Sequence, residues 1–213
     1  MPPAHPLDAV THPDPYPYYA TLARKQPLYR DAALDMWVAA HPATIDAVLR
    51  HPAARVRPAS EPVPRGLCPG AAGELFGRFV RMNDGAAHAR LKTLLVNFVQ
   101  QQHQDREQTT PPSFPSAPRD AAGIDQFLYS APVHAQAGFL GLAHALHADC
   151  AEDINRFLHA LSPNAGADRI AAGHAAATRL LAQLQAHLTG PRSTPALRRL
   201  SADAARDGIA GIW

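Results

Sequence analysis

A histidine and a lysine stand four residues apart in "FVRMNDGAAHARLKTLLVNFV", residues 79–99. His88 and Lys92 share one face of the helix that this segment predicts. Titratable or charged groups on a core-facing stripe are costly unless they are paired. We therefore expect an anionic group to meet His88 and Lys92, although a partly buried pair whose lysine reaches solvent remains an alternative. The apolar residues predicted on the same side are Leu91, Leu95, Val96 and Val99.

Two cysteines are the other candidates for ligand chemistry. Cys68 lies in "RGLCPGAAG", where a Cys-Pro dipeptide beside glycines could present a thiolate to a metal. The alternative is an inert, small apolar side chain, which is the usual role of a free cysteine. Cys150 opens an amphipathic segment and is predicted to pack in the core.

Three histidines could bind a metal or fill a core. His144 and His147 have the i, i+3 spacing of metal ligands, but no acidic or cysteine partner stands at a suitable distance, so a solvated or capping role is favoured. His174 interrupts an apolar stripe and is expected to be a core histidine with its hydrogen bonds satisfied. The sequence offers no glycine-rich phosphate loop and no Ser/His/Asp order. It therefore predicts no metal ligand and no catalytic residue.

Composition limits the class of protein. The chain has 213 residues, of which 46% are hydrophobic, so it can build a substantial core. Its net charge of +2 gives no argument for binding nucleic acid or an anionic membrane. Two isolated cysteines, no secretory signal at the start and no apolar run of about 20 residues predict a cytoplasmic protein outside the membrane.

The order of elements predicts a mainly α fold with a small antiparallel β-sheet near the N-terminus. Residues 1–14 are expected to form an extended, proline-punctuated arm. A helix over 15–25 is followed by two short strands, 28–31 and 36–40, and by a helix that begins at Pro42. Prolines and glycines predict an irregular stretch over 55–77 and a polar, proline-rich linker at about 100–120.

The second half of the chain is predicted to be helical. Residues 124–146 are apolar, with interruptions expected near Pro132 and Gly138. Residues 149–160 form an amphipathic helix with Ile154, Phe157, Leu158 and Leu161 on one side. A long helix over 168–188 follows, and another begins at Thr194.

These segments, in this order, resemble the N-terminal half of the soluble bacterial cytochrome P450 family of heme-thiolate monooxygenases. "DPYPYYATLARKQPLYRDAALDMWVAAHPATIDAVLRHP" looks like the family's opening helix, first strand pair and second helix. "RMNDGAAHARLK" looks like the entry to its third helix, and "SPNAGADRIAAGHAAATRLLAQL" is similar to the helices that roof its substrate pocket. The resemblance implies a partial cytochrome P450 fold over 15–213.

The resemblance also implies a cofactor and partners. The third helix of that family carries an H-x-x-x-R pattern that holds a heme propionate. This chain has His88 and Lys92 at those places. Lysine keeps the charge but lacks the planar two-pronged guanidinium. The family inserts one oxygen atom from O₂ into a small apolar substrate, with electrons from a ferredoxin-type donor.

The chain departs from the family in what it lacks. It has no counterpart of the oxygen-activating helix, of the E-x-x-R motif or of the glycine-rich loop with the heme-ligating cysteine. The isolated chain is therefore expected to be inactive. The alternative function is a non-catalytic helical module that binds a small hydrophobic ligand or a separate C-terminal half.

Overall fold

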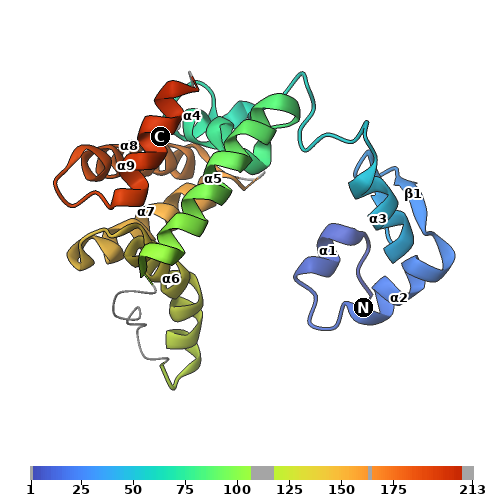
Figure 1. Ribbon diagram of the computed structural model, residues 1–213. Helices are drawn as coiled ribbons and strands as arrows, with labels where there is room; N and C mark the ends of the chain where they lie inside the picture. Colours follow the sequence, from blue (N-terminus) through green and yellow to red (C-terminus); the bar gives the residue numbers. More distant parts are fainter. Residues whose placement is uncertain (1, 107–117, 163–164, 208–213) are drawn as a thin grey trace. The chain divides into compact units, whose positions relative to one another are not determined.

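The computed structural model describes residues 2–106, 118–162 and 165–207, and α-helices make up most of this part (Figure 1). The chain divides into two compact units, Met1–Arg55 and Val56–Trp213. The expected division placed a single domain over 15–213 and did not anticipate this boundary. No described helix combines the length and the apolar character that a membrane span requires.

The first unit holds a two-stranded sheet among three short helices. Its elements are α1 (Pro6–Val10), α2 (Tyr16–Lys25), β1 (Leu28–Asp31), β2 (Met36–Ala39) and α3 (Pro42–Arg50). The strands are antiparallel, with Leu28 opposite Ala39 and Asp31 opposite Met36, which confirms the predicted small sheet. The expected extended arm is wrong at α1, because Pro6 starts that helix and His5 Nδ1 accepts the Asp8 N–H at its first turn.

The first unit buries few side chains. Ala9 is its one buried residue among those described. Trp37 on β2 is 68% exposed and Leu49 on α3 is 77% exposed. The apolar side chains Ile45 and Val48 of α3 are exposed as well.

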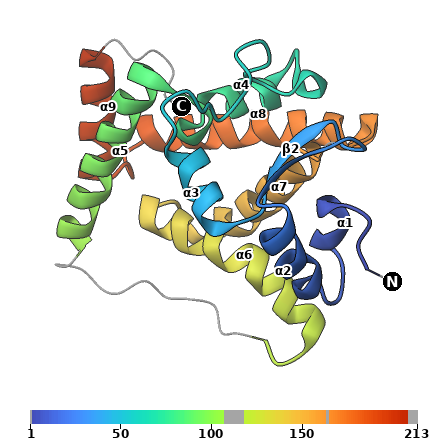
Figure 2. The same ribbon diagram turned by 90° about the vertical axis from the view of Figure 1, so that its right-hand side faces the viewer.

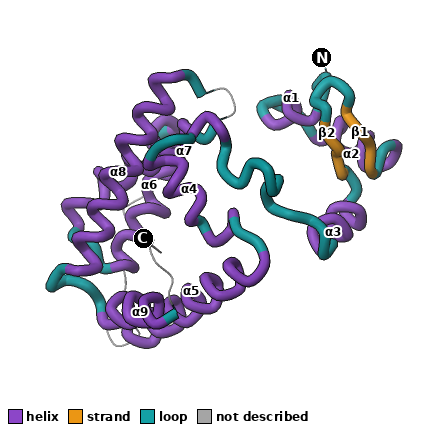
Figure 3. Tube along the Cα trace, turned by 90° about the horizontal axis from the view of Figure 1, so that it is seen from above, coloured by secondary structure: helices purple, strands orange, loops and turns teal. Residues whose placement is uncertain are grey.

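All the regular elements described in the second unit are helices. Its elements are η1 (Arg65–Leu67), α4 (Ala71–Arg78), η2 (Val80–Met82), α5 (Gly85–Arg106), α6 (Ala121–Leu140), η3 (His144–Leu146), α7 (His147–Ala160), α8 (Ala167–Thr189) and α9 (Pro195–Arg206). Helices α7 and α8 pack side by side, and α5 lies along α9 (Figures 2 and 3). The helices predicted over 149–160 and 168–188 are thus present.

Three sequence-based expectations for this unit are corrected. The stretch 55–77 is not irregular throughout, because α4 begins within it at Ala71. The linker expected at about 100–120 is helical as far as Arg106, where α5 ends, and its part over 107–117 lies outside the described residues. Helix α6 continues through Pro132, where an interruption was expected, since one missing N–H does not outweigh its packing against α7.

The core of the second unit consists of three apolar clusters. The first joins η1 and α4 to α7 and α8, the second joins α5 to α9, and the third joins α6 to α7 and α8. Phe157, which is 3% exposed, belongs to the first and meets the ring of Phe79 edge to face at 5.8 Å. The buried residues of the first cluster are Leu67, Ala72, Phe76, Phe157, Ala160 and Ala177.

The close approach of α7 and α8 depends on Gly173. A Cβ added there would lie 2.3 Å from Ala160 Cβ, whereas carbon atoms in good contact are roughly 3.5–4 Å apart. We expect Gly173→Ala to destabilise the chain by about 1–2 kcal/mol, because overpacking outweighs the gain in helix propensity. Thermal unfolding followed by circular dichroism measures this loss.

The control is Gly166→Ala, since a Cβ at that position meets nothing within 4 Å. Adding Ala160→Gly to Gly173→Ala removes the atom that clashes, so the double variant should be more stable than the sum of the two single effects. Additive effects would contradict the predicted clash.

Candidate functional site

Helix α5 places the two candidate cofactor-binding residues, and a tight turn fixes where it begins. Gly85 has a φ of +66°, a left-handed conformation that favours glycine. The Asn83 amide donates to the carbonyls of Gly77 and Phe79 at 2.9 and 2.8 Å, which ties the end of α4 to the start of α5. His88 and Lys92 follow in the first two turns of the helix.

The half-buried His88 ring is held by the backbone. Its Nδ1 lies 3.0 Å from the carbonyl oxygen of Val80, and because a carbonyl can only accept, Nδ1 carries a proton. In the neutral ring Nε2 is then an acceptor. His88 can therefore donate a hydrogen bond to a carboxylate only as the imidazolium.

Lys92 stands beside an exposed apolar groove. The groove has a volume of about 270 Å³, and its lining residues are Val80, Lys92, Leu95, Val96, Val99 and Gln100. Val80 belongs to this lining and its carbonyl also accepts from His88, but His88 itself does not line the groove. Among the described residues no carboxylate forms an ion pair with the exposed Lys92. A cation next to apolar surface suits an amphiphilic anion.

Lys92 and its apolar neighbours lie on a different face of α5 from the one that packs in the core. Leu95, Val96 and Val99 are 37%, 45% and 41% exposed, so the expectation of a core-facing stripe there is wrong. Leu94 and Phe98, which are 8% and 6% exposed, face the core instead and pack against α9. Helix α5 thus has two apolar faces, of which α9 covers one.

Neither cysteine lies in the groove beside Lys92. Cys68 is exposed and follows η1, ahead of α4. Cys150 is buried on α7, and its thiol donates to Gln183 Oε1 at 3.1 Å, which confirms a packing role. Burial raises the pKa of the Cys150 thiol, and the nearby Asp153 and Asp149 carboxylates add to this rise.

The histidines set aside in the sequence have structural contacts. His174 is half-buried, and its Nδ1 accepts the Ala72 N–H at 3.2 Å, so the expected hydrogen-bond partner is present. His147 is buried and donates from Nε2 to the Leu142 carbonyl at 3.1 Å, so it is neither solvated nor a cap. His144 is exposed, and its ring centroid lies 5.1 Å from that of His147. In the described part of the chain no three His, Cys, Asp or Glu residues could hold a metal ion.

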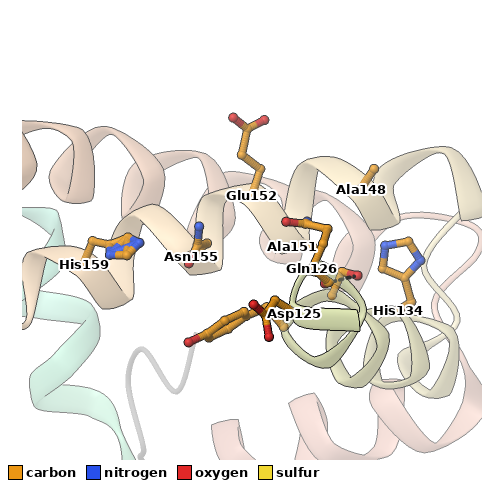
Figure 4. A pocket seen from close by; sticks show the side chains of 10 residues that line it. Asp125, Gln126, His134, Ala148, Ala151, Glu152, Asn155 and His159 are labelled. Carbon is orange, nitrogen blue, oxygen red and sulfur yellow. Dashed lines mark hydrogen bonds between the residues drawn. The ribbon is translucent and has the colours of Figure 1, made fainter. Parts of the chain in front are cut away.

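A wide polar groove lies between α6 and α7. It has a volume of about 740 Å³, and Asp125, Gln126 and His134 of α6 line it together with Glu152, Asn155 and His159 of α7. Figure 4 shows Glu152 directed away from Asp125, so the two carboxylates do not converge on one point. Asp125 and Glu152 therefore do not form an acid–base pair.

An ion pair between α7 and α8 was missed in the sequence. Asp153, 3% exposed, accepts from Arg179 Nε at 3.0 Å and also from the Nη2 of the same guanidinium. The pair raises the pKa of Arg179. The available signal was the position of Asp153 between Cys150 and Phe157 on the buried side of α7, where a carboxylate requires a partner.

No known protein family matches the chain, and no curated protein matches it. Among solved structures, the crystal structure of CalO2 resembles it with a TM-score of 0.67 at 21% sequence identity. The likeness covers 100% of this chain and 55% of CalO2, so the chain spans about half the length of that structure. The chain therefore shares its mainly α fold, with the small sheet near the N-terminus, with the corresponding part of CalO2.

Proposed function

We propose that this chain is the N-terminal part of a heme-dependent monooxygenase of the cytochrome P450 type. The whole protein would insert one oxygen atom from O₂ into a small apolar substrate, with electrons from a ferredoxin-type partner and release of the other oxygen as water. The observation that carries the proposal is the position of Lys92 at an apolar groove, with His88 one turn before it on the same helix.

The residues present fit one edge of a heme. The apolar walls formed by Leu95, Val96 and Val99 suit part of a porphyrin. The Lys92 ammonium, which has no carboxylate partner among the described residues, suits a propionate. His88 would add a second donor as the imidazolium, with its ring orientation set by the Val80 carbonyl. No cysteine lines this groove, so the described residues would contact the propionate edge of the heme and would not ligate its iron.

The heme, when bound, supplies the activation of O₂. The residues of this chain would bind and orient the group, and the exposed apolar face of α5 would exclude water from one of its edges. The chain alone is proposed to have no monooxygenase activity. The CalO2 likeness supports the proposal by its fold alone, since nearly half of that structure lies beyond the part that this chain matches.

Replacement of Lys92 tests the site. We expect Lys92→Ala to raise the Kd of protoporphyrin IX by about tenfold or more, because a charge-assisted contact contributes roughly 1.5–3 kcal/mol. Metal-free protoporphyrin carries both propionates. Because it has no iron, histidines elsewhere in the chain cannot bind it by ligating a metal. Its absorbance and fluorescence on titration with the chain give the Kd.

Arg90→Ala is the matched control, because Arg90 is a cation on the same helix that lines a different groove with Asp203 and Asp207. It should change the Kd less than twofold. Protoporphyrin dimethyl ester, which lacks the two charges, should bind wild type and Lys92→Ala alike. Equal losses in Lys92→Ala and Arg90→Ala would reject the assignment of Lys92.

A further inference from the structure

A further cavity, partly open to solvent and separate from the α5 groove, lies between α6, α7 and α8. It has a volume of about 310 Å³, and none of the described residues that line it is charged. Val133 and Leu140 of α6, Ile154 of α7, and Leu180 and Leu184 of α8 form most of its wall. Leu180 belongs to the third apolar cluster, so the cavity opens directly onto the core.

The polar groups of this cavity are few and neutral. Cys150 is 6% exposed, and its thiol donates to the side-chain oxygen of Gln183. This bond occupies the thiol hydrogen and one acceptor site of the amide. Because burial raises the pKa of the Cys150 thiol, the wall stays uncharged at neutral pH. The cavity thus disfavours ions, which would lose their hydration without gaining a partner.

The volume sets the size of an occupant. An apolar cavity of about 150 Å³ in a protein core accommodates benzene. The cavity here has about twice that volume, which matches two fused rings. Amide groups of Gln136 and Gln183 in the lining provide for one polar substituent.

We propose that the cavity between α6, α7 and α8 binds a small, uncharged, bicyclic aromatic molecule. Leu180, Ile154 and Leu184 hold its rings, and the amide of Gln136 or Gln183 meets a hydroxyl or an N–H group. Nothing in this assignment depends on heme or on the groove beside Lys92.

The test uses 2-naphthol as the probe and isothermal titration calorimetry of the full chain. We expect saturable binding at one site per chain, and at least tenfold weaker binding of 2-naphthoate, which has the same rings and a negative charge. Binding that does not saturate, or equal binding of the two probes, would overturn the proposal.

Two α7 variants localise the site. Ile154→Trp puts a large ring into the cavity and should weaken 2-naphthol binding at least tenfold. Leu158→Trp makes the same increase in size one turn later, at a side chain that is 50% exposed and does not line the cavity, and should change the Kd less than twofold. Equal effects of the two variants would contradict the location.

The Cys150 thiol provides a readout that needs no change in the cavity. In a Cys68→Ser background, saturating 2-naphthol should slow iodoacetamide alkylation of Cys150 at least fivefold, with 2-naphthoate at the same concentration as the control. An unchanged alkylation rate in the folded chain would reject the proposal. A second copy of the chain over the cavity would instead slow alkylation as the protein concentration rises without probe, and that result would also reject it.

Discussion

The reduced chain mixed with hemin and carbon monoxide is expected to show no red-shifted Soret band of the thiolate type. This band requires a cysteine thiolate on the iron. Cys150 is buried and hydrogen-bonded to Gln183, and burial raises the pKa of its thiol, so the thiolate is disfavoured. Cys68 is exposed and does not line the groove beside Lys92. The iron of any heme that the chain takes up should be ligated by a histidine.

Monooxygenase turnover by the isolated chain should be absent for the same reason. The measurement is a reduced, CO-bound difference spectrum, followed by an assay of O₂ and electron-donor consumption with apolar substrates. The double variant Cys68→Ala/Cys150→Ala supplies the thiol-free baseline. A thiolate-type band that disappears in Cys68→Ala alone would make Cys68 the iron ligand and contradict this prediction.

Local sequence signals were sufficient for the elements whose ends are capped and whose apolar residues recur on one face. The α3 helix is an example: Pro42 occupies its first turn, and His41 Nδ1 accepts the Ala43 N–H just before it. The β1–β2 pair was likewise predicted from two short runs across a turn, in which Asp31 accepts the N–H groups of Ala33 and Leu34.

Helix α4 was not predicted because contacts with other parts of the chain, rather than local sequence signals, stabilise it. Its glycines and the prolines before it suggest a loop. Gly73 is needed because a Cβ there would lie 2.5 Å from the carbonyl oxygen of Leu67, and His174 from α8 accepts the Ala72 N–H in the first turn of the helix. His174 lies about a hundred residues further along the chain, and no local sequence pattern predicts such a contact.

The sequence identified most of the apolar residues around Lys92 but not their exposure. Periodicity places Lys92 among apolar side chains, of which Leu95, Val96 and Val99 line the groove with it and Leu91 does not. Periodicity does not say which apolar face of α5 another helix covers. Leu197 and Leu200 of α9 pack on Leu94 and Phe98, and they thereby leave the face of Lys92 open.

Replacement of Phe157 tests the core that these distant contacts create. The sequence placed Phe157 and Leu158 on the same apolar side of their helix. In the structure Phe157 is 3% exposed and Leu158 is 50% exposed. We expect Phe157→Ala to cost about 3–5 kcal/mol, because it removes a buried ring and leaves a cavity among Leu67, Phe76 and Phe79.

Leu158→Ala is the matched control at the next position, and it should change the stability by less than about 0.5 kcal/mol, as surface substitutions do. Thermal unfolding by circular dichroism should therefore show a loss in Tm of more than about 6 °C for Phe157→Ala and a small change for Leu158→Ala. Equal losses would mean that both side chains lie in the core, as the periodicity of the sequence suggests. Unequal losses in the predicted order would show that the side of α7 that packs with Phe76 of α4 and with Phe79 is the buried one.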